Sequence, residues 1–197
     1  MNYTITQKQR LFQGFFAIDQ YSIDVETFAG QSMSIEREVF ERGTAAAVLP
    51  YDPIRDEVVL IEQFRAGAIN TQVNDDDNPW LFELIAGMHD KNESGRDLVI
   101  REAQEEANLK LNSLVYINKY LVSPGGTTET TELFLALVDT GQVTEGVFGL
   151  ADEHEDIKVH VLTFDDAFAM TQPGGRATNA MTLIGLQWLA LNKARFQ

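Results

Sequence analysis

Short apolar runs separated by turn residues dominate the hydrophobic pattern along this chain. Near the amino terminus, FFAIDQYSIDVETF and SMSIEREVF flank a turn at AGQ and predict two strands of a small antiparallel sheet. More continuously apolar runs, typical of buried strands, follow at TAAAVLP, EVVLIEQF and WLFELIAG. Aromatic and β-branched residues then predict further strands at LVYINKYLV, ELFLALV and IKVHVLTF. We therefore expect a protein built largely from short strands.

Two segments near the carboxyl terminus have helical spacing instead. In ATNAMTLIGLQWLALNKA, the apolar positions Leu183, Leu186, Leu189 and Ala190 recur every three to four residues. The stretch DDAFAMTQ opens with acids, which favour the amino terminus of a helix. Since strands dominate but helices interrupt them, the expected class is α+β with a mixed or antiparallel sheet. We divide the chain into an amino-terminal antiparallel lobe, residues 1–42, and a main domain, residues 43–197.

One predicted helix, within GMHDKNESGRDLVIREAQEEANL, concentrates its acids. On a helical wheel of roughly 100° per residue, Glu102, Glu105 and Glu106 fall within a wedge of about 100°, with Arg101 beside the cluster rather than inside it. The adjoining side is apolar and holds Val99, Ile100, Ala103 and Ala107. Like charges at these spacings are unfavourable in a bare helix, and Mg²⁺ prefers carboxylate oxygens. The spacing alone is compatible with either a divalent cation site or a solvated acidic face.

The composition narrows the classes of function. Thirty acidic and 15 basic residues give a net charge of −15 and a pI near 4.5, which disfavours nucleic acid and anionic membrane surfaces as partners. There is no cysteine, so disulfides, thiolate metal sites and cysteine nucleophiles are excluded. No apolar stretch is long enough for a signal sequence or a membrane span. We expect a soluble cytoplasmic protein.

The residues flanking the three glutamates favour the metal site. The stretch reads G-x5-E-x7-R-E-(apolar)-x-E-E-x-N-(apolar), which resembles the Nudix box, the signature of the Nudix hydrolase family, at eight of nine specified positions. The exception is Asn108, where the family usually has glycine. Because Asn tolerates a left-handed backbone, we expect the turn to persist. The resemblance implies an αβα sandwich around a mixed sheet and Mg²⁺-dependent hydrolysis of a nucleoside diphosphate linked to another group.

The resemblance continues outside the box. RGTAAAVLPYDPIRDEVVLIEQFR, SPGGTTE and GLADEHEDIKVHV are similar to segments of bacterial ADP-ribose pyrophosphatases, a branch of that family that cleaves ADP-sugars. This similarity implies hydrolysis of ADP-ribose to AMP and ribose 5-phosphate with two or three Mg²⁺ ions per site, or Mn²⁺ in their place. The implied metal ligands are Glu102, Glu106, Glu155 and the backbone carbonyl of Ala86. Glu153 would be the general base, because a carboxylate committed to Mg²⁺ has little basicity left. Arg101 and Glu105 complete the catalytic set.

The same similarity implies a homodimer with shared active sites. Phe15, Phe16, Arg37 and Glu38 of the partner subunit's amino-terminal sheet would close the adenine pocket. Because the substrate is anionic and the protein is acidic, arginines should bind the phosphates, and similar enzymes have them at the positions of Arg37, Arg42 and Arg65. The remaining ribose or phosphate contacts would be Met88, Ser123, Gly125 and Glu129.

Other interpretations stay open. The substrate could be another nucleotide sugar, such as GDP-mannose or ADP-glucose, and a Nudix-fold sensor would bind ADP-ribose without cleaving it. Three scattered histidines, His89, His154 and His160, lack metal-ligand spacing, so structural or surface roles are expected. NDDDN at 74–78 is interpreted as a solvated loop. PGGRATN lacks the Lys-Ser/Thr of a phosphate-binding loop and is interpreted as a turn.

Overall fold

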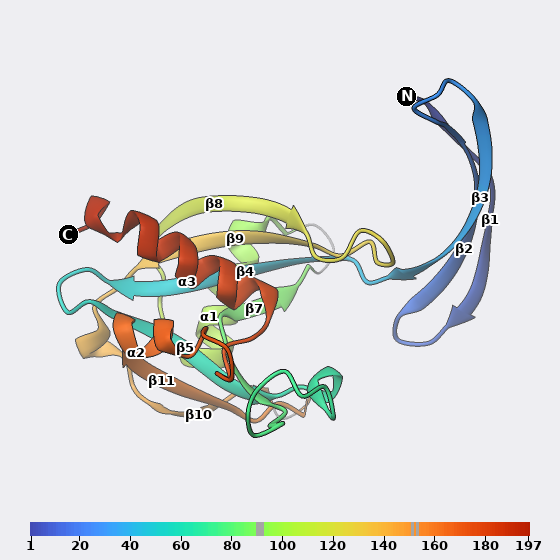
Figure 1. Cartoon of the computed structure of the whole chain (residues 1–197). Coiled ribbons are helices and arrows are strands. Elements are labelled where there is room, and N and C mark those ends of the chain that lie inside the picture. The colour runs from blue at the N-terminus through green and yellow to red at the C-terminus, as the bar shows by residue number, and fades with distance from the viewer. Residues whose placement is uncertain (90–92, 151, 153) are drawn as a thin grey trace. The chain divides into compact units, whose positions relative to one another are not determined.

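The chain folds into two units of unequal size. The computed structural model describes residues 1–89, 93–150, 152 and 154–197 (Figure 1). The first unit contains Met1–Thr44 and Tyr120–Thr130, and the second contains Ala45–Lys119 and Thr131–Gln197. Each unit is described by itself below.

The first unit is a three-stranded antiparallel sheet in the order β1-β2-β3. Its strands are β1 (Tyr3–Gln13), β2 (Ala17–Glu26) and β3 (Ser32–Glu41). β2 and β3 pair without interruption from Ala17↔Glu41 to Glu26↔Ser32. The two strands expected here are confirmed, whereas β1 was missed, because its sequence YTITQKQRLFQ mixes polar and apolar residues and every residue of it is exposed.

One buried carboxylate ties the first two strands together. Asp19 on β2 is 1% exposed and lies between Lys8 and Arg10 on β1. The Lys8 Nζ is 2.9 Å from Asp19 Oδ2, and the Arg10 guanidinium contacts both carboxylate oxygens. The hydrogen bonds from Arg10 and Lys8 hold the pKa of Asp19 well below its ordinary value. The pairing explains how an aspartate can be buried in so small a sheet.

The second unit is built on a mixed sheet in the order β10-β11-β5-β4-β9-β8. Its strands are β4 (Thr44–Asp52), β5 (Glu57–Phe64), β6 (Trp80–Glu83), β7 (Ile85–Met88), β8 (Ser113–Leu121), β9 (Thr130–Leu137), β10 (Gly146–Phe148) and β11 (Ile157–Thr163). β4 and β5 pair only near their connection, at Tyr51↔Val58 and Asp52↔Glu57. Beyond it, β6 pairs with β5 and β7 with β4. WLFELIAG, expected as one strand, therefore forms two short strands, and each pairs with a different neighbour.

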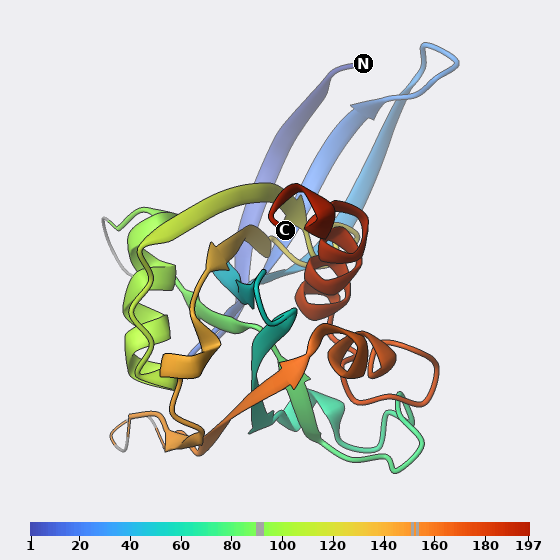
Figure 2. The same cartoon turned by 90° about the vertical axis from the view of Figure 1, so that its left-hand side faces the viewer.

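Helices cover both faces of this sheet. The α-helices are α1 (Gly95–Ala107), α2 (Phe164–Ala169) and α3 (Ala180–Asn192), and 3₁₀ turns lie at η1 (Ala66–Ala68), η2 (Thr140–Gln142) and η4 (Lys193–Arg195). Figure 2 shows α1 and α3 on opposite sides of the strands. Under α1, the core includes Leu98, Val99, Ile61 and Val159. On the other side α3 approaches closely, because a Cβ at Gly185 would lie 3.0 Å from Leu84.

The predicted class and sandwich architecture are confirmed, including both carboxyl-terminal helices. The short strand β10 was not expected, since three residues carry no detectable periodicity. None of the described helices is long and apolar enough to cross a membrane.

Candidate active site

The acidic helix α1 begins and ends where its sequence provides caps. The Ser94 hydroxyl accepts a hydrogen bond from the Asp97 backbone N–H at 3.2 Å, and Asp97 places a negative charge in the first turn. At the other end, Asn108 is left-handed, with φ 47° and ψ 36°. The Leu109 N–H then donates to the Ala103 carbonyl at 2.8 Å. The expectation that Asn replaces glycine at this turn is confirmed.

Glu106 is the most unusual residue on this helix. The wheel placed it on an acidic face, but it is 3% exposed and lies among the buried residues of α1. Its Oε2 accepts a hydrogen bond from the Ala86 N–H of β7 at 3.2 Å. Burial raises the pKa of Glu106 well above its ordinary value, and the nearby carboxylates of Glu102 and Glu155 raise it further. The fold thus holds a carboxylate where its negative charge is unfavourable.

Glu102 lies one turn earlier, against the same strand. Its side chain is 12% exposed, and a Cβ at Gly87 of β7 would overlap its carboxylate. Glycine at position 87 is therefore required for Glu102 to approach the strand. The solvated acidic face that spacing alone allowed is not what the structure shows.

Arg101 was expected beside the glutamate cluster, and this expectation is wrong. Its Nη1 is 2.8 Å from Glu105 Oε2 and 3.1 Å from Glu102 Oε1, and its Nη2 is 3.1 Å from Glu93 Oε1. A flexible side chain can reach glutamates at i+1 and i+4, which a wheel of backbone directions does not represent. The hydrogen bonds to Glu93 raise the pKa of Arg101 above its ordinary value, and the carboxylates of Glu102 and Glu105 raise it further. Arg101 therefore supplies part of the compensation that the acidic cluster needs.

Glu155 reaches the same region from a distant loop. Its Oε2 accepts from the Leu150 N–H at 3.0 Å, and a Cβ at Gly149, where φ is 104°, would lie 2.7 Å from the Cβ of Glu155. With these contacts, Glu155 lies within electrostatic range of Glu106. Glu153, expected as the general base, lies outside the described residues.

The charge of Arg65 interacts with two of these acids, Glu106 and Glu155. Its Nε and Nη2 are 2.9 and 2.7 Å from Oε2 of Glu83, which also accepts from the Gln63 amide at 3.1 Å. Burial lowers the pKa of Arg65, but the carboxylates of Glu83, Glu106 and Glu155 raise it overall. A cavity of about 330 Å³ adjoins Arg65 and Glu83. Sequence reasoning missed Glu83 and Gln63; their signal was a polar residue in an otherwise apolar strand.

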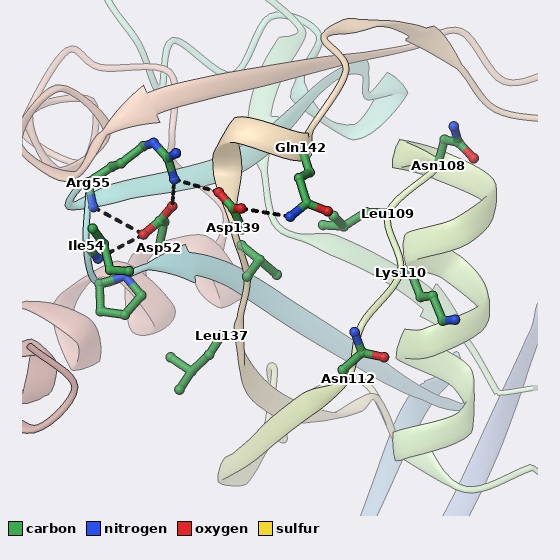
Figure 3. A pocket seen from close by; sticks show the side chains of 12 residues that line it. Asp52, Ile54, Arg55, Asn108, Leu109, Lys110, Asn112, Leu137, Asp139 and Gln142 are labelled. Carbon is green, nitrogen blue, oxygen red and sulfur yellow. Dashed lines mark hydrogen bonds and ion pairs between the residues drawn. The ribbon is translucent and has the colours of Figure 1, made fainter.

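A larger cavity lies elsewhere. It measures about 640 Å³ and is bordered by Asp52, Arg55, Asp139 and the segment after α1, as Figure 3 shows. Three of its charged groups already pair with one another, since Arg55 Nη1 is 2.7 Å from Asp52 and 2.6 Å from Asp139. None of the box glutamates lines it. Size alone therefore does not identify the reactive site.

The expected substrate residues divide between the two units. Arg65 and Met88 lie in the second unit, and the others lie in the first: Phe15, Phe16, Arg37, Glu38, Arg42, Ser123, Gly125 and Glu129. Within the first unit, Arg42 stacks on the Phe16 ring at 4.3 Å, and its Nε is 3.5 Å from Glu129 Oε2. Phe15 is 93% exposed. These contacts bring Phe16, Arg42 and Glu129 together, while the roles of the whole set stay predictions.

The donor set of the second unit fits a hard divalent cation. Among the described residues, no three acidic or histidine side chains are close enough together to hold a metal ion. The carboxylates of Glu102 and Glu155 nevertheless raise the pKa of Glu106, whose charge is not neutralised by the N–H of Ala86. Carboxylate oxygens are the preferred ligands of Mg²⁺. His160 instead contacts Glu62, a structural role as expected.

Comparisons with known proteins identify the family of this chain. The NUDIX domain matches residues 41–181. ADP-ribose pyrophosphatase of Escherichia coli (strain K12) is 44% identical over 189 residues, 95% of this chain and 88% of that protein. The protein of the same name from Haemophilus influenzae is 42% identical over 194 residues, 98% of this chain and 88% of its own length. GDP-mannose pyrophosphatase of Yersinia pestis (strain Pestoides F) is 34% identical over 186 residues, covering 94% and 90%. A solved ADP compounds hydrolase shares the fold, with a TM-score of 0.67 at 19% identity over 98% of this chain and 96% of that one.

Proposed function

Because this chain belongs to the Nudix family, we propose that it is a hydrolase that cleaves the pyrophosphate of ADP-ribose to AMP and ribose 5-phosphate. The observation that carries the proposal is the buried Glu106 carboxylate beside Glu102 and Glu155 on and around the box helix. The 44% identity to an ADP-ribose pyrophosphatase over nearly the whole chain supports the choice of substrate.

Glu102, Glu106, Glu155 and the Ala86 carbonyl would hold the divalent ions. Enzymes of this kind generally use a divalent metal, and we propose Mg²⁺, two or three ions per site, with Mn²⁺ as a substitute. When bound, Mg²⁺ polarises the phosphorus and stabilises the leaving phosphate. The Ala86 N–H and the close approach at Gly87 orient Glu106 and Glu102 before any ion arrives. This arrangement lowers the reorganisation needed on binding.

The protein residues divide the remaining work. Glu153 would accept the proton of the attacking water, since it is not among the metal ligands. Arg65 would neutralise phosphate charge, because a guanidinium offers forked donors to phosphate oxygens. Arg101 would hold Glu102 and Glu105 in place through its contacts at 3.1 and 2.8 Å.

We also propose a homodimer that completes the substrate pocket. A three-stranded sheet alone buries little, and the first unit exposes large apolar side chains: Ile5, Leu11, Phe12, Phe15, Phe28 and Met33. In a dimer, Phe15, Phe16, Arg37 and Glu38 of one subunit would close the adenine pocket of the other. Arg42, Met88, Ser123, Gly125 and Glu129 would contact ribose or phosphate. Sedimentation equilibrium tests this directly, and a monomer at micromolar concentration contradicts it.

Product analysis tests the reaction. The purified protein is incubated with ADP-ribose and Mg²⁺, and AMP and ribose 5-phosphate are quantified by chromatography against a no-enzyme control and an EDTA control. Release of both products in equal amounts is expected. A protein that binds ADP-ribose but returns it uncut is a sensor and not a hydrolase.

A second substrate has specific support in the 34% identity to a GDP-mannose pyrophosphatase. Both substrates contain the same pyrophosphate, so the acidic site cannot distinguish them. A panel of ADP-ribose, ADP-glucose and GDP-mannose, compared by kcat/KM, ranks them. We expect ADP-ribose to lead; a higher value for GDP-mannose reverses the assignment.

A further inference from the structure

An ion pair with a buried glutamate, Glu83, fixes the orientation of Arg65. Glu83 is 2% exposed, and its Oε2 lies within 3.1 Å of three nitrogens, namely Nε and Nη2 of Arg65 and Nε2 of Gln63. Both contacts of Arg65 use one edge of its guanidinium. They leave the Nη1 N–H groups to donate to another acceptor.

Strand register explains why these three side chains meet. On β5, Gln63 follows Ile61 by two residues, and Arg65 continues the alternation just after the strand ends. Glu83 on β6 pairs directly with Ile61, and Leu81 pairs with Gln63. Ile61 belongs to the core packed under α1. Gln63, Arg65 and Glu83 therefore share the sheet face that carries the box helix.

The same geometry places Arg65 beside the acids. Its charge interacts with Glu106 and Glu155, and it borders the 330 Å³ cavity. An unrestrained arginine in this position would form an ion pair with the ligand carboxylates and compete with the metal. Pairing one edge of its guanidinium with Glu83 prevents that collapse and keeps the other edge available.

We propose that Glu83, assisted by Gln63, is a positioning residue that aims Arg65 at the substrate pyrophosphate. This inference rests on the proposed function. It assigns to Glu83 no contact with substrate and no role in metal binding. Its effect on catalysis passes through Arg65 alone.

The opposite sheet face offers a matched control. Glu62 is the neighbour of Gln63, and its Oε1 lies 2.8 Å from Nη2 of Arg176 while its Oε2 lies 2.9 Å from Nε2 of His160. It is also a mostly buried glutamate, and it pairs with an arginine that is distant in the sequence. Its position on β5 directs it to the other face, away from α1. Glu62→Gln therefore removes a comparable ion pair from the opposite face of the same sheet.

A double-mutant cycle tests the proposal. Wild type, Glu83→Gln, Arg65→Ala, the double variant and Glu62→Gln are compared by kcat, KM and Mg²⁺ activation with ADP-ribose. We expect Glu83→Gln to lower kcat/KM by about 10- to 100-fold, since small misplacements of a positioning group have effects of this size. The double variant should be no worse than Arg65→Ala, because the two residues act as one unit. Glu62→Gln should stay within about two-fold of wild type. The Mg²⁺ concentration needed for half-maximal activity should rise in Glu83→Gln but not in the double variant, because only a released Arg65 competes with the metal.

Three results overturn the proposal. The first is a near-normal kcat/KM in Glu83→Gln, and the second is a double variant whose loss of kcat/KM equals the product of the two single losses. The third is a loss of kcat/KM in Glu62→Gln as large as that in Glu83→Gln. Thermal melting checks that each variant is folded. If Glu83→Gln is not folded, Gln63→Leu replaces it in the cycle. The same criteria apply, and the expected loss of kcat/KM is smaller. If wild type fails to cleave ADP-ribose, the proposed function fails, and equilibrium binding of ADP-ribose across the cycle still tests the coupling.

Discussion

Two buried carboxylates in this protein have opposite surroundings. Asp19 in the amino-terminal sheet and Glu106 on α1 are 1% and 3% exposed. Asp19 lies between Arg10 and Lys8, whose hydrogen bonds lower its pKa. Glu106 receives one backbone N–H and faces Glu102 and Glu155, so that burial and the like charges raise its pKa.

The difference shows which carboxylate serves the fold alone. A buried charge that is paired and hydrogen-bonded is satisfied in the folded chain, and nothing further need bind to it. A buried charge among like charges is a persistent cost, which a divalent cation relieves. The fold tolerates that cost at Glu106 because α1 is anchored elsewhere, by its caps and by Leu98, Val99 and Ala103.

The largest effect is expected on the catalytic activity of a variant at Glu106, the carboxylate that we assign to metal binding. Glu106→Gln should lower kcat for ADP-ribose by about 100- to 1,000-fold, because metal stabilisation of the transition state contributes several kcal/mol. Without metal, the same variant should melt no lower than wild type, since it removes an unfavourable charge. Steady-state kinetics and calorimetry in EDTA check both parts. Near-normal turnover, or a large loss of stability, would show that Glu106 is an ordinary structural residue.

The next prediction concerns the space that Glu102 needs. Gly87→Ala should lower kcat/KM by about ten-fold or more, since its methyl group would displace the Glu102 carboxylate, and displacements of this order have such effects. Gly67→Ala is the control, because a Cβ there meets nothing within 4 Å. Equal activity in the two variants would mean that the position of Glu102 is unimportant.

The sequence predicted most strands, α3 and the box helix, because each carries a period that secondary structure imposes. It also predicted the left-handed turn at Asn108, a property local to that residue. It did not predict the burial of Glu106, since a helical wheel gives directions but not what lies opposite. That burial depends on β7, whose Ala86 and Gly87 approach the helix only in the folded chain.

The Arg65–Glu83–Gln63 cluster escaped sequence reasoning for a related reason. The three residues are spread over 63–83 and meet through the pairing of β5 with β6. Neither the sequence of β5 nor that of β6 indicates that these side chains are neighbours. Resemblance to the family predicts a role for Arg65, whereas its contact with Glu83 exists only in the folded chain.

The pH dependence of stability should separate the two carboxylates, with a smaller effect. The folded-state pKa of Glu106 is raised above its ordinary value of 4.5, so the folded chain binds a proton more tightly than the unfolded chain. Stability without metal should therefore fall as pH rises from about 4.5 through the folded pKa. Saturating Mg²⁺ should oppose this loss, by about 2.7 kcal/mol at 100 times its Kd. Denaturant titrations from pH 4.5 to 8, with and without Mg²⁺, measure it, and Glu106→Gln should abolish most of the slope. An identical slope in that variant would assign the effect to other groups.

The smallest effect is expected at Asp19. Its folded-state pKa is lowered, so its contribution to stability is present above the ordinary value of 3.8 and is lost as pH falls below that value, the reverse of Glu106. Asp19→Asn should lower the melting temperature at neutral pH only modestly, because Lys8 and Arg10 are about half exposed and water can solvate them once the carboxylate is gone. Glu36→Gln on β3, an exposed position of the same sheet, is the control and should melt as wild type does. Mg²⁺ should raise the melting temperature of Asp19→Asn as much as that of wild type, since the proposed metal ligands all belong to the other unit. A variant that lost this response would mean that the amino-terminal sheet contributes to the metal site.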